Sequence, residues 1–538
     1  MKIRYFPAIL FAAAAPVMGA EEVSAGPTIN LYNRTELLFQ ETSGLGKAQS
    51  FYDPGNLVFH ETDIVANGRV GNWNSLFNAT VRYTDTRQYD PVNLSTPKLM
   101  WQLSDAQNQI NFGDYFAVFS PYSLTKSIKG AAIQHNFSDD QNYIRAAYGS
   151  FDGQWSYLFR NPNNEPMDRY GGGVRVQQAA DNWRIGASLV QAADRWGDPR
   201  RGMYDGYRQV MPAIDWEWRT PGWLFSGEHA YAATTVNSGT TGATSDLNGS
   251  ANRFTFRGNL RDVSLDGLLE RVGSRFATLG GGATPDRMRT MLRGDWRLGA
   301  LWRFNAMADY YYNDLDHQLA TRTTVKAIDV GTTRRRLFDR RSASLSLGLK
   351  TRWTETDDNT SETRTDRLKL RFKDRYFDEA LDLSLGLEKT INDVRQGATP
   401  GSNDSYLYDI GLGWRAALNR QWTLRTNLDL GHTELQNPTN GNFDIMDTVR
   451  LAIAAEATDR SQFGVSVDYG GNRMTIANAN SQVDRHSVFY QAQPAWTGGG
   501  TVRAELTENT YRFDVASNNF RERLLRLVFN WNLDIKPR

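Results

Sequence analysis

LDLSLGLE, residues 381–388, places a leucine at every second position, with Asp, Ser, Gly or Glu on the alternate positions. Side chains alternate between two faces with period two in a β-strand, whereas a helix repeats every ~3.6 residues. This stretch therefore predicts a strand with one apolar and one polar face. The same alternation recurs in four further stretches: SLSLGLKTRW at 344–353, YDIGLGWR at 408–415, QWTLRTNLDL at 421–430, and the run at 525–533.

The two faces of these stretches favour a membrane barrel over a soluble sheet. Arg, Lys, Asp and Glu occur in mid-strand on the polar face, as expected where that face lines a water-filled lumen. The apolar face often ends in aromatic residues, as at 310–312, Trp414, Trp422 and Trp531, and such rings are typical of bilayer interfaces. We therefore expect an all-β fold, a single large transmembrane antiparallel β-barrel in the outer membrane.

The spacing of the strand-like stretches sets the size of this barrel. A tilted transmembrane strand needs ~10 residues, and the chain of 538 residues has room for about 24 to 26 of them with their connections. Short turn signals alternate with longer polar segments, among which 194–207 and 314–341 are expected to be loops. Residues 57–538 are assigned to the barrel, and residues 26–56 to a lead-in, a first strand or a plug segment.

The first 25 residues have the pattern of a cleaved export signal. Lys2 and Arg4 precede an apolar run that ends near Ala15, and small residues follow up to Ala25. This order of charged, apolar and small residues is typical of secretory signal peptides. We expect residues 1–25 to be removed and the mature chain to reach the outer membrane of a Gram-negative bacterium, in contact with lipid and lipopolysaccharide.

Composition argues against several classes of function. The 61 Lys and Arg residues against 60 Asp and Glu leave a formal net charge of +1, so no global field attracts nucleic acid. The absence of cysteine excludes disulfides, thiolate metal sites and covalently attached haem in this chain. The six histidines are scattered without a metal-ligand spacing, and no nucleophile or phosphate-loop motif occurs. We expect no enzyme activity, no metal and no cofactor in this chain.

One connection between expected strands is unusually apolar. INFGDYFAVFSPYSLTKSIKGAAIQHNFSDD, residues 110–140, reads as two strands joined by DYFAVFSPYSL. Such a connection should be buried, either against the barrel wall or inside the lumen. We take it as the candidate constriction or docking segment, with seven residues singled out: Gly113, Asp114, Tyr115, Phe116, Phe119, Tyr122 and Leu124.

The same segment resembles the early barrel hairpins of fimbrial ushers and related large export barrels. The matching positions are Gly113, Asp114, Lys129, Gly130, Ser138 and Asp139. The stretch ADYYYNDLDHQ, residues 308–318, is similar to the sheath barrels of porin–cytochrome conduits, which hold a multihaem partner. The first resemblance implies a large barrel of the export class. The second implies that any haem belongs to a partner protein.

Two arginine-rich clusters are the other candidate binding features. They could attract an anionic solute or polysaccharide at the pore, or contact lipopolysaccharide phosphates through bidentate hydrogen bonds. The candidate basic pore or rim residues are Arg195, Arg200, Arg201, Arg208, Arg334, Arg335, Arg336, Arg340 and Arg341.

These observations favour a non-catalytic outer-membrane channel or conduit that gives passage to, or houses, a macromolecule or partner protein. A barrel of more than ~20 strands is too wide to stay open without leaking. We therefore expect an internal constriction, or a periplasmic or lumen-filling partner protein. Two alternatives stay open: the sheath barrel of a porin–cytochrome electron-transfer conduit, and a general solute porin or surface-binding barrel.

Overall fold

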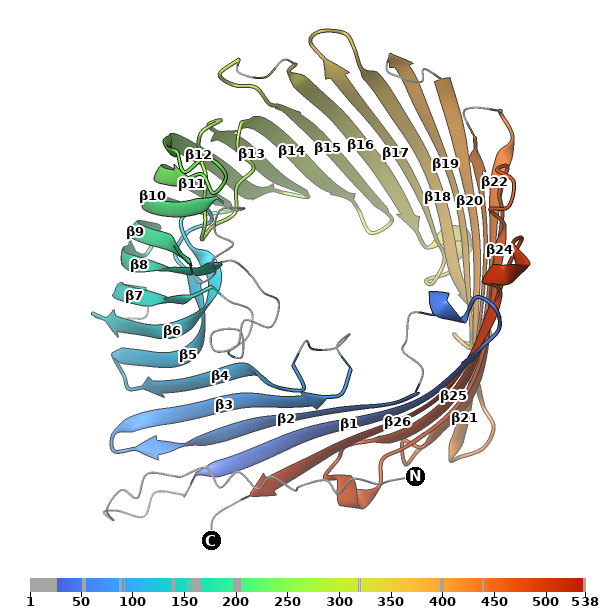
Figure 1. The fold of residues 1–538 in the computed structure, drawn as a ribbon. Helices are drawn as coiled ribbons and strands as arrows, with labels where there is room; N and C mark the ends of the chain where they lie inside the picture. The colour runs from blue at the N-terminus through green and yellow to red at the C-terminus, as the bar shows by residue number, and fades with distance from the viewer. Residues whose placement is uncertain are drawn as a thin grey trace.

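The computed structural model describes residues 27–50, 55–86, 90, 92–137, 141–151, 155, 167–196, 205–317, 319, 321–396, 401–437 and 440–535. Within this part the chain forms one closed sheet of 26 strands, which Figure 1 shows as a ring. Among the described residues, no helix is long and apolar enough to cross a membrane. The expected signal peptide, residues 1–25, lies outside them.

The strands follow one another around the ring in chain order, each antiparallel to its neighbours. Their bounds are β1 Thr28–Ser43, β2 Gly55–Val70, β3 Trp73–Thr84, β4 Leu94–Ser104, β5 Asn108–Val118, β6 Thr125–Asn136, β7 Tyr143–Ser150, β8 Met167–Ala180, β9 Trp183–Trp196, β10 Gly206–Thr220, β11 Trp223–Asn237, β12 Thr244–Leu260, β13 Val263–Val272, β14 Arg287–Leu298, β15 Trp302–Tyr312, β16 Thr323–Arg335, β17 Ser344–Thr356, β18 Glu362–Tyr376, β19 Leu381–Gln396, β20 Gly401–Ala417, β21 Trp422–Gln436, β22 Phe443–Ala457, β23 Gln462–Arg473, β24 Ser481–Ala492, β25 Val502–Phe513 and β26 Phe520–Ile535. Among the described residues, short 3-10 helices lie in four connections, at Lys47–Gln49, Leu337–Asp339, Ala495–Thr497 and Ala516–Asn518.

The ring closes where β1 meets β26. Their register runs from Ile29 opposite Ile535 to Ser43 opposite Arg521, so this junction is as long as the strands themselves. Arg526 and Glu36 form two hydrogen bonds across it, of 2.7 and 3.0 Å. Closure removes the free sheet edges that a membrane interior cannot tolerate. The predicted fold class, a single large antiparallel β-barrel, is confirmed.

The two ends of the barrel differ in their connections. The connections after even-numbered strands share one end with the first and last strand residues, and several span only two residues, as at 181–182, 221–222 and 261–262. The described connections after odd-numbered strands lie at the other end and include the long segment 273–286. We call these the short-turn end and the long-loop end.

The outer face of the barrel is apolar. Leu345, Leu347 and Leu349 of β17 are exposed large side chains on one face, and the alternate positions carry Ser, Gly and Lys. Near the short-turn end, Trp302 stacks on Phe304 with ring centroids 5.9 Å apart. Exposed apolar side chains bounded by aromatic rings are the surface that a bilayer covers. The barrel is therefore a membrane-spanning one.

The structure corrects one predicted loop, residues 314–341, and decides the role of most of residues 26–56. The predicted loop 314–341 is wrong as a single loop, because β16 occupies Thr323–Arg335 within it. Only Ile328 and Val330 give the outer face of β16 large aliphatic side chains, so its alternation is weak. Of the roles left open for 26–56, residues 28–43 form the barrel strand β1.

Leu428 and Asn427 are neighbours in mid-β21 that face opposite sides of the wall. Leu428 lies opposite Leu412 and Leu451, whereas Asn427 lies opposite Gly413 and Ala452. Leu428→Arg should destabilise the barrel in vesicles by about 2–4 kcal/mol, because it places a charge near the bilayer midplane. Asn427→Arg, in the lumen, should change stability by less than about 1 kcal/mol. Urea titration of the folded form in vesicles measures both, and equal effects would contradict the assigned faces.

Candidate functional site

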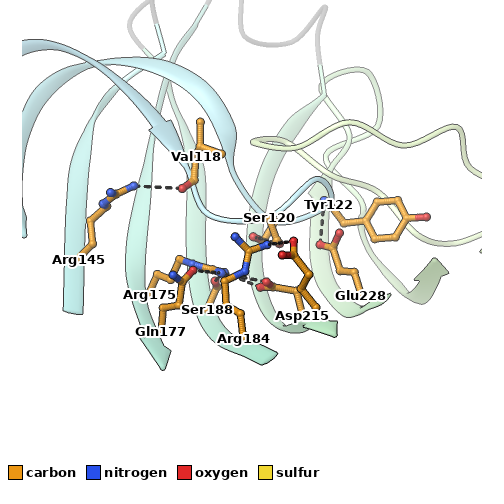
Figure 2. A network of polar contacts seen from close by, with 12 residues as sticks. Val118, Ser120, Tyr122, Arg145, Arg175, Gln177, Arg184, Ser188, Asp215 and Glu228 are labelled. Atoms are coloured by element: carbon orange, nitrogen blue, oxygen red, sulfur yellow. Dashed lines mark hydrogen bonds and ion pairs between the residues drawn. The ribbon is translucent and has the colours of Figure 1, made fainter. Parts of the chain in front are cut away.

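The loop-side half of the β5–β6 hairpin is not part of the barrel wall. β4 pairs with β5 only as far as Gly113, and β6 pairs with β7 only from Lys129. Within the described sheet, Asp114 pairs only with Lys129, and the strand residues between 115 and 128 pair only with each other. Figure 2 shows the loop that carries Val118, Ser120 and Tyr122 crossing in front of the strands that carry Arg175 and Asp215. We call residues 114–128 the lumen hairpin.

Glycines stand where both strands of the hairpin leave the wall. Gly113 has a φ of +96°, which side chains rarely adopt, and a Cβ there would lie 2.0 Å from the carbonyl oxygen of Leu99. A Cβ at Gly130 would lie 2.1 Å from the carbonyl oxygen of Tyr148. The chain can bend into the lumen at these positions because glycine permits both the conformation and the close backbone approach.

A buried ion pair replaces the strand pairing that is lost at this bend. The Asp114 carboxylate contacts the Lys129 ammonium, and both side chains are largely buried. The Leu99 N–H, which has no β5 partner at this level, donates to Asp114 Oδ2 at 2.6 Å. Trp155 Nε1 donates to the same oxygen at 2.9 Å, and its ring faces the Lys129 ammonium. The pair thus satisfies the backbone where the sheet splits.

The lumen hairpin packs on an arc of the inner wall made of small side chains. Phe119, Tyr122 and Leu124 are 4%, 1% and 0% exposed. They belong to one apolar cluster with residues of β9 to β13 and of the 273–286 connection: Val190, Met211, Ala213, Ala230, Ala232, Ala251, Val272 and Phe276. The four alanines leave the space that the aromatic and leucine side chains fill. Each such buried large apolar side chain contributes roughly 1.5–3 kcal/mol.

Polar contacts fix the tip of the hairpin to β11 and β13. The Tyr122 N–H donates to Glu228 Oε1 at 2.9 Å, and the Tyr122 hydroxyl donates to Glu270 Oε1 at 2.9 Å. Arg287 contacts the other Glu270 oxygen at 2.7 Å. Hydrogen bonds also join the tip to the 273–286 connection, including Thr278 Oγ1 to the Tyr122 carbonyl at 2.9 Å. Both glutamates therefore have structural partners.

A second buried network lies on the inner face of β7 to β10. Arg175 contacts Asp215 through two hydrogen bonds, of 2.5 and 2.9 Å, and also donates to Tyr143, Gln177 and Ser188. A Cβ at Gly186 would lie 2.2 Å from the Arg175 guanidinium, so the glycine gives the arginine its path across β9. Figure 2 shows this group beside the hairpin tip. Arg145 links the two regions by donating to the Val118 carbonyl at 3.3 Å.

The seven predicted residues of the apolar connection lie together at the lumen hairpin, but not on one face. Tyr115, Phe119, Tyr122 and Leu124 face or join the buried cluster, whereas Phe116 is 61% exposed on the opposite face. Gly113 and Asp114 form the bend. Ser138 and Asp139, from the usher resemblance, lie outside the described residues.

The two arginine clusters do not meet. Arg195 ends β9 near the long-loop end, and Arg200 and Arg201 lie outside the described residues. Arg334 and Arg335 end β16 at the short-turn end, followed by the exposed turn residues Arg336 and Arg341. Arg208 lies on the outer face of the barrel, like Val210 two residues further along the strand. Arg334 stacks on Trp302, which also lies on the outer face. Arg340 forms an ion pair with Asp374 at 2.8 Å. These residues therefore do not form one basic rim.

Sequence reasoning missed the wall residues that receive the hairpin. Glu228 and Asp215 are single acids in mid-strand, and their partners, Tyr122 at the hairpin tip and Arg175 of β8, lie far away in sequence. The alanine-rich inner face of β11, with Ala230 and Ala232, is the signal that could have marked this arc. Among the described residues, no group of three or more His, Asp or Glu side chains is placed to hold a metal ion.

Comparison with known proteins adds likeness only at the level of solved structures. No protein-family model and no curated protein matches this chain. Similar solved structures include the P pilus usher (PapC) translocation pore, with 11% identity, 94% of this chain and 99% of that chain covered, and a TM-score of 0.33. They also include a bacterial polysaccharide outer membrane secretin, with 8% identity, 60% of this chain and 91% of that chain covered, and a TM-score of 0.27. A third is the outer membrane protein OpdK from Pseudomonas aeruginosa, with 11% identity, 94% of this chain and 99% of that chain covered, and a TM-score of 0.28. These values assign the chain to none of them.

Two aromatic residues of the lumen hairpin, the buried Tyr122 and the exposed Phe116, allow a test variant to be compared with a control variant. Tyr122→Ala should release the hairpin, because it empties a packed site and costs about 3–5 kcal/mol locally. Phe116→Ala, on the exposed face, should leave it docked. A spin label on Ser127→Cys is unique, because the chain has no cysteine, and its mobility reports docking. Equal mobility in the two variants would contradict packing through Tyr122.

Docking of the hairpin should also depend on alkaline pH. Burial, and next the Glu270 carboxylate, raise the pKa of the Tyr122 phenol above its ordinary value. An undocked tyrosine loses its proton near pH ~10 while the docked one keeps it, so docking weakens above about pH 10 and is unaffected by this group below it. The same label should become mobile over this range in the wild type, and less so in Tyr122→Phe. An identical pH profile in Tyr122→Phe would exclude Tyr122 as the cause.

Proposed function

We propose that this protein is a passive, non-catalytic conduit in the outer membrane of a Gram-negative bacterium, through which a macromolecule or partner protein passes. The observation that carries this proposal is the closed ring of 26 strands with an apolar outer face and a charged, polar inner face. A wall of this kind separates a wet lumen from lipid.

The width of the ring supports a large cargo. Strands ~4.8 Å apart, tilted by about 40°, give a ring of 26 strands a diameter of about 50 Å between backbones, and about 40 Å between side chains. Barrels of 16 to 18 strands already leave an aqueous channel. A lumen of this size exceeds what a small solute needs.

The lumen hairpin supports partial occlusion and not a complete plug. It is two strands wide, about 10 Å, and packs about 10 Å from the wall. Its cross-section is therefore on the order of a tenth of the lumen. The expectation that residues 113–124 constrict the pore becomes a proposal that they narrow one side of it.

The charged residues of the hairpin site support a structural role. Glu228, Glu270 and Asp215 each accept hydrogen bonds from the hairpin tip or from a neighbouring arginine. Glu228 and Glu270 orient the hairpin on the wall, and Asp215 orients Arg175 beside it. The proposed activity is accordingly passage, with selectivity set by the charge of the inner face.

Single-channel recording in planar bilayers tests the conduit. The wild-type barrel should conduct, and replacement of residues 115–128 by Asn-Gly, which joins Asp114 to Lys129 through a tight turn, should raise conductance by on the order of a tenth. The Phe116→Ala variant serves as the control with the hairpin in place. A several-fold increase would instead identify the hairpin as a gate. A wild-type barrel that does not conduct and carries a stoichiometric protein would replace passage by housing, the arrangement of a sheath barrel.

A further inference from the structure

A column of cations runs along the inner face of β18. In the stretch RLKLRFKDR, residues 367–375, Arg or Lys occupies every second position and alternates with Leu, Leu, Phe and Asp. Leu368 is an exposed apolar residue of the outer face, so the cations on the alternate positions face the lumen. Two residues of β17, Lys350 and Arg352, share this face. The resulting inner cationic stripe comprises Lys350, Arg352, Arg367, Lys369, Arg371, Lys373 and Arg375.

Only part of the inner cationic stripe is neutralised by its neighbours. Glu388 of β19 contacts both Arg367 and Lys369, at 2.9 and 3.1 Å, and Asp382 contacts Arg375 at 2.8 Å. Asp329 of β16 lies opposite Lys350, and Asp409 of β20 lies over Gly386, the residue opposite Arg371. Arg375 also contacts Glu379 of the adjoining turn at 3.3 Å, so seven cations face five carboxylates, an excess of two positive charges.

Four members of the stripe make no ion pair with any described residue: Lys350, Arg352, Arg371 and Lys373. Of these, Arg352 donates a hydrogen bond to the Tyr311 hydroxyl at 3.0 Å. Elsewhere on the inner face, cations lie against acids of the next strand. Arg526 contacts Glu36, Arg289 contacts Asp309 at 2.9 Å, and Arg450 contacts Asp468 at 3.2 Å. The stripe is therefore a local feature, which a net charge of +1 for the whole chain conceals.

The stripe covers most of the height of the membrane-spanning wall. Successive side chains on one face of a strand lie about 6.8 Å apart, so the five cations of β18 span about 27 Å along the strand, or about 21 Å along the membrane normal at a tilt of about 40°. The apolar band of such a barrel is about 25 Å tall. A single small anion would meet only one or two of these cations at a time, whereas an extended chain with recurring charges would meet all of them.

The surroundings of the stripe distinguish between kinds of polyanion. The inner faces of β17, β18 and β19 carry no aromatic side chain over their described lengths; Trp353, Phe372 and Tyr376 lie on the outer face. Binding of single-stranded nucleic acid relies on aromatic stacking of the bases. The inner face instead carries the hydroxyls of Ser344, Ser346 and Ser384 beside arginines, which bind carboxylates through paired hydrogen bonds.

We propose that the inner cationic stripe is a binding track for a linear acidic polysaccharide. The carboxylates of the polysaccharide bind the Lys and Arg side chains, and its hydroxyl groups bind the serine hydroxyls. This inference rests on the proposed function, because it names the class of macromolecule that the conduit passes. The track guides the chain along one wall of the lumen, at a distance from the lumen hairpin around the ring.

Binding of a fluorescently labelled oligogalacturonate to the purified full-length barrel in detergent tests the track. The wild type should bind, and affinity should fall as salt rises from about 0.01 M to about 0.1 M, because the contacts are exposed to solvent. The triple variant Lys350→Gln, Arg371→Gln, Lys373→Gln should weaken binding about tenfold, at up to 1 kcal/mol for each lost contact. These three side chains make no ion pair, so their removal leaves no stranded carboxylate.

A matched variant removes the same charge from the inner face outside the stripe: Lys98→Gln, Arg297→Gln and Arg485→Gln, on β4, β14 and β24. It should weaken binding by less than about threefold, and a neutral malto-oligosaccharide of equal length should not bind. Equal losses in the two triple variants, no loss in the stripe variant, or tighter binding of oligothymidylate would overturn the proposal. If the triple variant does not fold, Arg371→Gln alone is compared with Arg297→Gln.

Conductance of the same preparations separates this inference from the proposed function. A barrel that conducts but does not bind oligogalacturonate overturns the track and leaves the conduit intact. A barrel that binds but does not conduct overturns the conduit. Both measurements use the same folded protein, which is checked by its heat-modifiable migration.

Discussion

The pairing of every backbone N–H and C=O group within the membrane is the constraint on which the rest of this structure depends. Lipid offers no substitute partner, so the sheet has to close, and β1 meets β26 over their full length. Among the described residues, the wall splits where β5 leaves β4, and the backbone groups there also find partners. Where β5 leaves β4 at Gly113, the Asp114 carboxylate accepts the hydrogen bond of Leu99 that a strand would have taken. The lumen hairpin is therefore an exception that the backbone can tolerate.

Closure also decides what each inner-face residue can do, because residues opposite one another in the register share a face. The inner wall is divided into two arcs on this basis. From β9 to β13 the inward side chains include four small alanines and single acids, and a folded-in segment with Tyr122 at its tip covers them. On β17 and β18 the inward positions carry Lys and Arg, and solvent covers them. The first arc is a packing surface, and the second is a charged surface that is open to the lumen.

The barrel class and strand number were predictable from the sequence to the extent that leucines marked the outer face. β17 and β19 carry runs of three or four such leucines, and β21 carries three such leucines, whereas β16 has only Ile328 and Val330 there and was taken for part of a loop. The aromatic run at 310–312 shows a second limit. Its middle residue, Tyr311, points inward to accept a hydrogen bond from Arg352, and only its neighbours can belong to an outer girdle. Residue type indicates a strand, but the face of a given residue follows from the register.

The sequence by itself determined that this chain forms a membrane-spanning barrel of this size, because period-two alternation is a local property that each strand carries independently. It also showed that residues 115–124 are too apolar to remain in water. Only the tertiary structure decided where that segment lies, since its partners Glu228, Glu270 and the alanines of β10 to β12 come from distant strands. The same holds for the cations of β18. Their excess charge exists because β16, β19 and β20 bring too few carboxylates beside them, and strand adjacency alone sets that balance.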